Sequence, residues 1–279
     1  MIQEYRPSQF QILPPVVKNL LIVNGIMYLA SVVLESKFGY DLADILGLHY
    51  PASEYFYPHQ FITHLFMHGS FMHIFSNMLG LWMFGNMLEN LWGSKRFFTY
   101  YFICGLGAAA IHTLFTWYEV EQFRHAVEQY AAQANPIDFK LFLNKYKGFI
   151  AQDQYNHINN LFSAWQQSPT DVGFINESVT IANELLKNKM DIPTVGASGA
   201  VFGILLAFGM LFPNTIIYIY FAIPMKAKYF VMLYGGFELY SGFQNNPTDN
   251  VAHFAHLGGM LFGFIMIKLW NKNNRKQFY

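Results

Sequence analysis

The sequence predicts an all-α polytopic membrane protein: a bundle of six transmembrane helices with a soluble helical insert between the third and the fourth. Hydrophobic residues make up 53% of the 279 positions. Charged residues make up only 12%, which is about half the usual share of a soluble domain. Six apolar segments approach the length that crosses a bilayer. A polar stretch rich in Gln, Asn, Glu and Lys lies between the third segment and the fourth.

The apolar segments define the domain organisation. They are residues 16–34, 71–88, 97–115, 198–212, 229–243 and 251–270. We therefore expect an N-terminal segment at 1–15, a membrane domain at 16–117 and 192–270, an insert at 118–191 and a basic tail at 271–279. Residues 214–222 are also apolar but too few to cross the membrane as a helix, so we expect them to continue along the interface.

Three parts of the insert show the spacing of apolar residues that is typical of helices. They are residues 119–134, 137–167 and 174–188, with Pro136 and Pro169 between them. The insert is therefore predicted to be a small helical subdomain on the membrane surface.

The positions of Lys and Arg predict the orientation, because cytoplasmic loops are enriched in both. With six spans, the basic residues of the termini and of the short loops all fall on the side of the two termini: Arg6, Lys18, Lys95, Arg96, Lys226, Lys228, Lys268, Lys272, Arg275 and Lys276. Both termini are therefore predicted to be cytoplasmic and the insert extracytoplasmic. The net charge is zero, so nothing indicates a nucleic-acid partner.

Polar residues gather at the outer ends of the second, fourth and sixth segments. His73 and Asn77 are four residues apart and share a helical face. Ser198 begins the fourth segment, and His253 and His256 lie near the start of the sixth. Ionisable residues inside a membrane are costly and usually functional, so this end of the bundle is a candidate site.

Small residues suggest that the fourth and sixth segments pack closely. Gly199 and Gly203 are four apart, and Ala255, Gly259 and Gly263 repeat the same step. Such faces allow two backbones to approach closely in lipid, and a helix contact is also the simplest explanation of the serine-containing stretch.

If the two faces meet, Ser198 and His256 lie side by side. A serine within hydrogen-bond reach of a histidine is a minimal activated nucleophile. His256 would take the hydroxyl proton and return it to the leaving amine. His73 and Asn77 would donate hydrogen bonds to the developing oxyanion, together with the backbone N–H of Ser198.

These residues form motifs that resemble those of the rhomboid intramembrane serine proteases. The second segment carries His73-x-x-x-Asn77 within the stretch from His64, the fourth begins Gly196-Ala197-Ser198-Gly199, and the sixth reads Ala255-His256-x-x-Gly259-x-x-x-Gly263. Glu89 to Ser94 also resembles the Glu-x-x-x-Gly-Ser turn of that family. The resemblance covers residues 16–115 and 194–270.

The resemblance implies hydrolysis of peptide bonds in or next to transmembrane segments of membrane-protein substrates. It implies a Ser198–His256 dyad without a third acid, oxyanion stabilisation by His73 and Asn77, and neither cofactor nor metal. It also implies a multi-pass protein of the bacterial cytoplasmic (inner) membrane, with the bilayer and transmembrane proteins as partners. Two alternatives are a catalytically weak or inactive rhomboid-like protein that binds transmembrane clients, and a histidine-bearing transporter or metal carrier.

Several other ionisable residues near these motifs need an interpretation. His256 rather than His253 matches the family motif, because glycines follow it at the third and seventh positions. His253 is therefore expected to be a structural polar contact. Asp249 is expected to be a plain loop residue, and Glu238 in the fifth segment has no assigned role.

Two further features concern the surroundings of the site. His64 and His68 have a spacing that can bind metal, but the further ligands of a zinc site are not evident nearby. Phe202 stands where some rhomboid family members have a tyrosine that packs on the catalytic histidine. A phenylalanine keeps the ring contact and loses the hydroxyl.

Overall fold

The structure is a computed structural model that describes residues 10–219, 222–244 and 251–275 and is predominantly helical. The elements are α1 (Pro15–Phe38), α2 (Ala43–Leu46), α3 (Gln60–Thr63), η1 (His64–Phe66), α4 (Phe71–Gly80), the π-helical turn η2 (Leu81–Gly85), α5 (Asn86–Trp92), α6 (Ser94–Ala132), α7 (Pro136–Tyr146), η3 (Lys147–Phe149), α8 (Gln154–Gln167), α9 (Val172–Asp191), α10 (Ser198–Leu211), β1 (Ile216–Ile219), β2 (Ile223–Lys226), α11 (Ala227–Gln244) and α12 (His253–Arg275).

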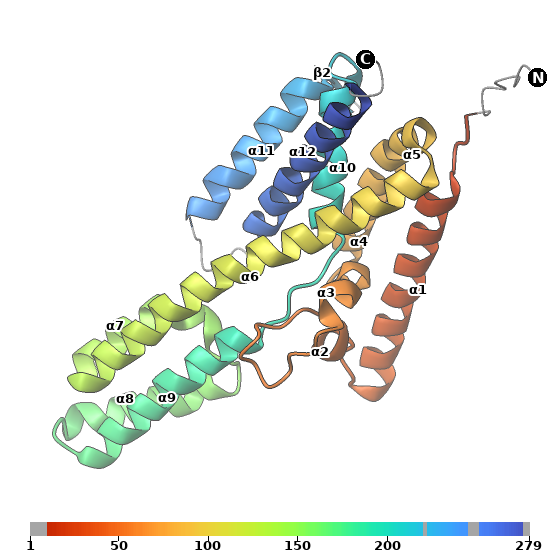
Figure 1. The fold of residues 1–279 in the computed structure, drawn as a ribbon. Helices are drawn as coiled ribbons and strands as arrows, with labels where there is room; N and C mark the ends of the chain where they lie inside the picture. Colours follow the sequence, from red (N-terminus) through yellow and green to blue (C-terminus); the bar gives the residue numbers. More distant parts are fainter. Residues whose placement is uncertain (1–9, 220–221, 245–250, 276–279) are drawn as a thin grey trace, which may run out of the picture.

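Each of the six apolar segments contains helix, and α6, α10 and α12 pack against one another at the centre of the molecule (Figure 1). Among the described residues, three helices are long and apolar enough to cross a membrane: Pro15–Phe38, Ser94–Ala132 and His253–Asn271. The apolar helix α10 is shorter, with 14 residues. At about 1.5 Å per residue it extends only about 21 Å, against about 30 Å for the hydrocarbon core of a bilayer.

Helix α6 differs from the expectation of a break after residue 115. It runs without interruption for 39 residues, through the region where a separate helix at 119–134 was expected. The composition changes from apolar to polar along α6, but no glycine or proline lies between Ala108 and Asn135 to end the helix. The helix is about 58 Å long and therefore extends well beyond a bilayer core.

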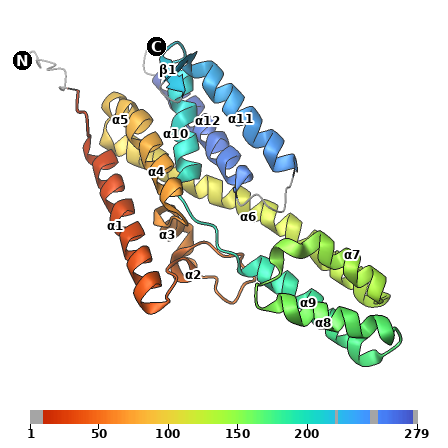
Figure 2. The ribbon, with the colours of Figure 1, turned by 180° about the vertical axis from the view of Figure 1, so that it is seen from behind.

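The insert forms a helical subdomain with a core of its own, which the second half of α6 shares with α7, α8 and α9. Phe139, Trp165 and Leu185 are fully buried in this core, and Tyr130 donates a hydrogen bond to Ser178 over 2.5 Å. The expected single helix at 137–167 is divided into α7 and α8, with Gly148 in the turn between them. In both views the subdomain lies at the opposite end of the molecule from the start of α1 (Figure 2).

The all-α expectation is wrong after α10, where residues 216–226 contain a β-hairpin. Strands β1 and β2 are antiparallel, with Ile216 opposite Lys226 and Ile219 opposite Ile223. The isoleucines of this segment favour an extended backbone, so the expected continuation along the interface is a two-stranded ribbon.

The first turn of α1 is attached to the turn between α5 and α6 by one buried carboxylate. Glu89 accepts hydrogen bonds from the backbone N–H groups of Val16 at 3.0 Å and Val17 at 2.9 Å. The hydroxyl of Ser94 donates to the same carboxylate over 2.6 Å. A negative charge at a helix N-terminus is also stabilised by the positive end of the helix dipole. Glu89 thus joins α1, α5 and α6 at the position of the Glu-x-x-x-Gly-Ser turn.

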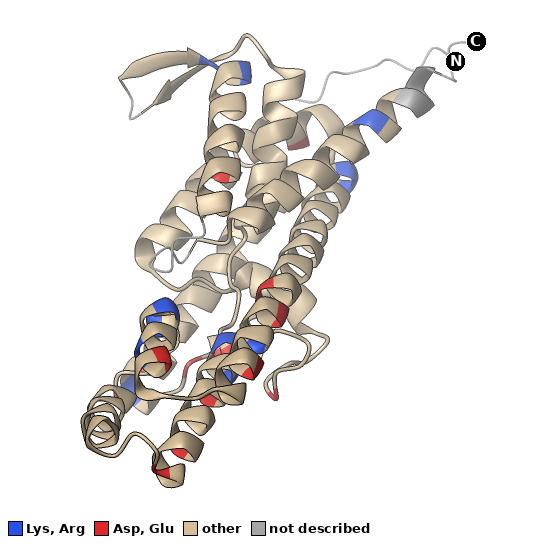
Figure 3. Cartoon of the chain, turned by 90° about the vertical axis from the view of Figure 1, so that its left-hand side faces the viewer, with Lys and Arg blue, Asp and Glu red and all other residues tan. Residues whose placement is uncertain are grey.

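Charged residues are distributed unevenly along the molecule. They gather over the insert subdomain and near the opposite end, and the helices between these ends carry few of them (Figure 3). Within the insert, Lys189 forms an ion pair with Glu119 over 2.8 Å. The nearly uncharged middle is the part of the bundle that suits a lipid environment.

Helices α10 and α12 meet through glycines, as the small-residue spacing predicts. A Cβ added at Gly259 would collide with the backbone carbonyl of Gly199. A Cβ at Gly203 would lie 3.0 Å from the backbone oxygen of Gly259 and 2.5 Å from the Cys104 sulfur of α6. Tyr100 of α6 donates a hydrogen bond to the Gly203 carbonyl over 2.8 Å. The backbones of α10 and α12 therefore touch directly, and the side chains of Cys104 and Tyr100 of α6 pack beside them.

We predict that Gly259→Ala destabilises the bundle, because the added methyl forces the backbones of α10 and α12 apart. Overpacking of this kind costs about 1–3 kcal/mol. The midpoint of thermal unfolding in detergent should fall by several degrees. Gly236→Ala in α11 is the matched control, since a Cβ there meets nothing within 4 Å. Equal midpoints for the two variants would contradict the close contact.

Candidate active site

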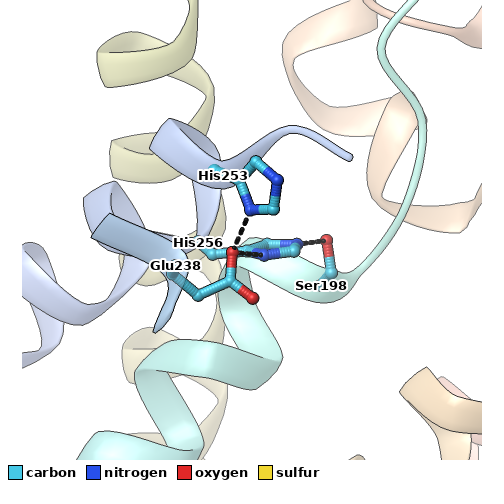
Figure 4. A network of polar contacts seen from close by, with 4 residues as sticks. All are labelled: Ser198, Glu238, His253 and His256. Carbon is cyan, nitrogen blue, oxygen red and sulfur yellow. Dashed lines mark hydrogen bonds and ion pairs between the residues drawn. The ribbon is translucent and has the colours of Figure 1, made fainter. Parts of the chain in front are cut away.

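Ser198 and His256 face each other at the start of α10 and α12. The Oγ atom of Ser198 lies 2.9 Å from Nε2 of His256 (Figure 4). Ser198 is the first residue of α10, and His256 lies in the first turn of α12, next to Ala255, whose carbonyl borders Gly199. The glycine contact between the two helices therefore brings the hydroxyl and the imidazole to the same depth.

The second ring nitrogen of His256 contacts an acid. Oε2 of Glu238, in α11, lies 2.8 Å from Nδ1 of His256 and 2.7 Å from Nδ1 of His253. All three side chains are buried. The structure thus differs from the expected pair without a third acid: an acid is present, and it comes from α11. The sequence signal for this contact was the presence of an acid, Glu238, within the apolar segment 229–243. Asp249 lies outside the described residues.

An aromatic ring holds the imidazole from its face. Phe202 stacks on His256 with the ring centroids 4.0 Å apart and the planes 7° from parallel. Phe202 lies one helical turn after Ser198 on α10, so the same helix carries the hydroxyl and the ring. The ring contact expected from the position of Phe202 is present.

The chain before Ser198 is held in an extended form by the segment between α1 and α4. Leu48 and Thr194 exchange two backbone hydrogen bonds of 2.9 and 2.8 Å. The N–H of Gly196 donates to the carbonyl of His64 over 2.8 Å. Gly196 has a φ of 123°, which side chains other than glycine disfavour. These bonds set the direction from which the chain enters α10.

His73 and Asn77 lie beside Gly196, on the serine side of the site. A Cβ built at Gly196 would lie 2.6 Å from Nε2 of His73 and 3.7 Å from Nδ2 of Asn77. Asn77 is only 5% exposed, yet its Nδ2 has no hydrogen-bond partner among the described residues. A buried donor without a partner is unfavourable, so this amide is available to a group that binds here.

The start of α10 adds backbone donors to the same place. The first N–H groups of a helix have no partner within the helix, and Ala197 at the N-cap provides no side-chain acceptor. The helix dipole makes this end positive. An oxygen that becomes negative next to Ser198 would therefore face the start of α10, His73 and Asn77.

The two histidines before α4, His64 and His68, make contacts within the protein. Nδ1 of His64 lies 2.8 Å from the carbonyl of Gln60 and donates to it, since a carbonyl only accepts. Burial lowers the pKa of His64 to about 4, so its ring is neutral at pH 7. His68 packs edge-on against His73, with the ring centroids 5.0 Å apart. In the described chain, the group with metal-ligand spacing is Glu238, His253 and His256 rather than this pair.

Comparison with known protein families identifies the class of protein. The family model of the rhomboid domain matches residues 56–120 and 171–272, which is more than half of the chain. A comparison with curated proteins found no match. The match and the apolar helices of the chain identify an integral membrane protein. The matched family consists mostly of serine intramembrane proteases. The chain belongs to the rhomboid family. The unmatched residues 121–170 fall within the insert and the end of α6.

Proposed function

We propose that this protein is an intramembrane serine endopeptidase that cleaves transmembrane proteins in or next to their membrane-spanning segments. The observation that carries the proposal is the 2.9 Å contact between Oγ of Ser198 and Nε2 of His256 in a membrane protein of the rhomboid family. Ser198 is the nucleophile and His256 the general base.

The reaction follows from these two groups. Ser198 attacks the carbonyl carbon of the substrate peptide while His256 takes the hydroxyl proton. His256 then gives the proton to the leaving amine, and an acyl-enzyme remains. A water molecule, deprotonated by His256 in turn, hydrolyses the acyl-enzyme and frees Ser198. No cofactor takes part in the proposed reaction.

The oxyanion of each tetrahedral intermediate is assigned to the donors around Gly196. We assign three donors to it: Nδ2 of Asn77, Nε2–H of His73 and the backbone N–H of Ser198. Preorganised donors in a site with little water stabilise developing charge more strongly than water does. The unpartnered amide of Asn77 supports this assignment.

The short α10 supports a site below the membrane surface. If its last turn lies at one face of the bilayer, its 14 residues end about 9 Å short of the other face of the hydrocarbon core. Non-helical backbone at that depth is tolerated where protein or a water-filled cavity surrounds it. The extended segment before Ser198, paired with Leu48 and His64, meets this condition.

The alternative function is an inactive rhomboid-like protein that binds transmembrane clients. Such a protein has no use for a serine hydroxyl in contact with an imidazole. The contact between Ser198 and His256 therefore favours the protease. A histidine-bearing transporter is disfavoured for the same reason.

We predict that Ser198→Ala abolishes cleavage of a model transmembrane substrate by the purified protein in liposomes. The loss should be about a thousandfold or more, because the nucleophile is removed. The thermal unfolding midpoint should stay the same, since one hydroxyl contributes little packing. A serine-directed mechanism-based inhibitor should label the wild type and neither Ser198→Ala nor His256→Ala. Cleavage by Ser198→Ala near the wild-type rate would refute the assignment.

For the oxyanion donor, we predict that Asn77→Ala lowers kcat about a hundredfold with little change in KM. The contact forms mainly in the transition state, so substrate binding should be nearly unaffected. Asn24→Ala, which removes a fully buried amide of α1, is the matched control and should leave kcat unchanged. An increase in KM at constant kcat would place Asn77 in substrate positioning instead.

We also propose the orientation: both termini cytoplasmic, and residues 118–191 outside with the site, in a bacterial cytoplasmic membrane. The six-span arrangement and the basic short loops support it. In intact right-side-out vesicles, whose cytoplasmic face is inside, external protease should then cut the protein within the insert and leave residues 272–279 untouched. Permeabilised vesicles, the control, should lose the tail as well. Cleavage of the tail in intact vesicles, with the insert protected, would reverse the orientation.

A further inference from the structure

We propose that Glu238 completes a Ser198–His256–Glu238 triad as the residue that positions the general base. This inference rests on the proposed protease function and deepens it. Glu238 comes from α11, Ser198 from α10 and His256 from α12, so three different helices meet at the imidazole. Figure 4 shows the side chains in line, with His256 between the carboxylate and the hydroxyl.

The two contacts of His256 require opposite roles of its two ring nitrogens. A carboxylate accepts hydrogen bonds and donates none, so Nδ1 of His256, 2.8 Å from Oε2 of Glu238, carries the proton. Nε2 then presents its lone pair to the hydroxyl of Ser198, 2.9 Å away. This is the tautomer that removes the serine proton. Among the described residues, Glu238 is the hydrogen-bond partner of Nδ1 that selects this tautomer.

Glu238 also acts on the charge that forms during the reaction. His256 becomes an imidazolium when it takes the proton, and the carboxylate next to it is a stabilising charge. The side chain of Glu238 is 3% exposed and that of His256 10%, so little water weakens this attraction.

His253 holds the carboxylate in place. Its Nδ1 lies 2.7 Å from the same Oε2 atom of Glu238. His253 precedes His256 by about one helical turn, so α12 contributes both imidazoles to one oxygen of α11. We therefore assign His253 a supporting role that acts through Glu238.

Hydrogen bonds account for this cluster better than a metal ion does. Zinc bonds of about 2.0–2.1 Å in a tetrahedron keep ligand atoms about 3.3 Å apart. Oε2 of Glu238 is closer than this to both imidazole nitrogens, at 2.7 and 2.8 Å. The cluster is therefore assigned as a hydrogen-bonded network that positions His256.

The test compares Glu238→Gln with the wild type on the same transmembrane substrate in liposomes. Glutamine keeps the size and one acceptor oxygen but removes the charge. We expect kcat and the rate of labelling by the serine-directed inhibitor to fall about a hundredfold, with KM and the unfolding midpoint unchanged. His253→Gln, the matched control, should show a smaller loss of kcat. Wild-type kcat in Glu238→Gln, with Ser198→Ala inactive, would overturn the triad and leave the protease intact.

Two further measurements read the proposed state in the wild-type protein itself. Nitrogen NMR of isotope-labelled histidines, with His256→Ala to assign the signal, should show His256 protonated at Nδ1 and unprotonated at Nε2. The opposite tautomer would overturn the proposal. Chelation with EDTA should leave kcat unchanged. A loss of kcat that added zinc restores would show that the cluster is a metal site and not a hydrogen-bonded network.

Discussion

The contact of α10 with α12 through glycine backbones is the constraint on which the site depends. Gly259 packs directly on the carbonyl of Gly199, and this carbonyl lies one residue after Ser198. Lipid offers no hydrophobic driving force between helices, so close packing of small residues stabilises such contacts instead. The direct contact of the two backbones here lets the hydroxyl and the imidazole approach to 2.9 Å.

The site is assembled from elements with separate reasons for their positions. Leu48 and His64 hold the extended chain before Ser198, Phe202 stacks on the imidazole, and the buried carboxylate of α11 holds it from the other edge. The residues on the serine side are donors, and the residues behind the imidazole include an acceptor. Hydrogen-bond donors and a carboxylate thus lie on opposite sides of Ser198 and His256, which suits the proposed reaction, in which a proton moves away from an oxygen that becomes negative.

The candidate site was more predictable from the sequence than the fold around it. Ser198, His73, Asn77 and His256 stand in short motifs at helix starts, where spacing and chain order indicate a shared face. Glu238 joins through a tertiary contact between α11 and α12, and no local pattern relates it to His256. The length of α6 was missed because a change of composition does not end a helix when glycine and proline are absent. The β-hairpin was missed because a short apolar run does not distinguish strand from helix.

The uninterrupted α6 makes the insert a mechanical extension of the membrane bundle. Its first half packs on α10 and α12, where Ala108 lies against Gly199 and Gly258, and its second half carries Val120, Phe123 and Val127 into the insert core. From Ala108 to its end, α6 contains neither proline nor glycine, the residues at which helices most often bend, so this stretch has no hinge between the bundle contact and the insert. A movement of the insert would therefore be transmitted along α6 to the part of the bundle where Ser198 and His256, the proposed nucleophile and base, meet. Excision of residues 118–191 would cut through α6 rather than remove a separate module.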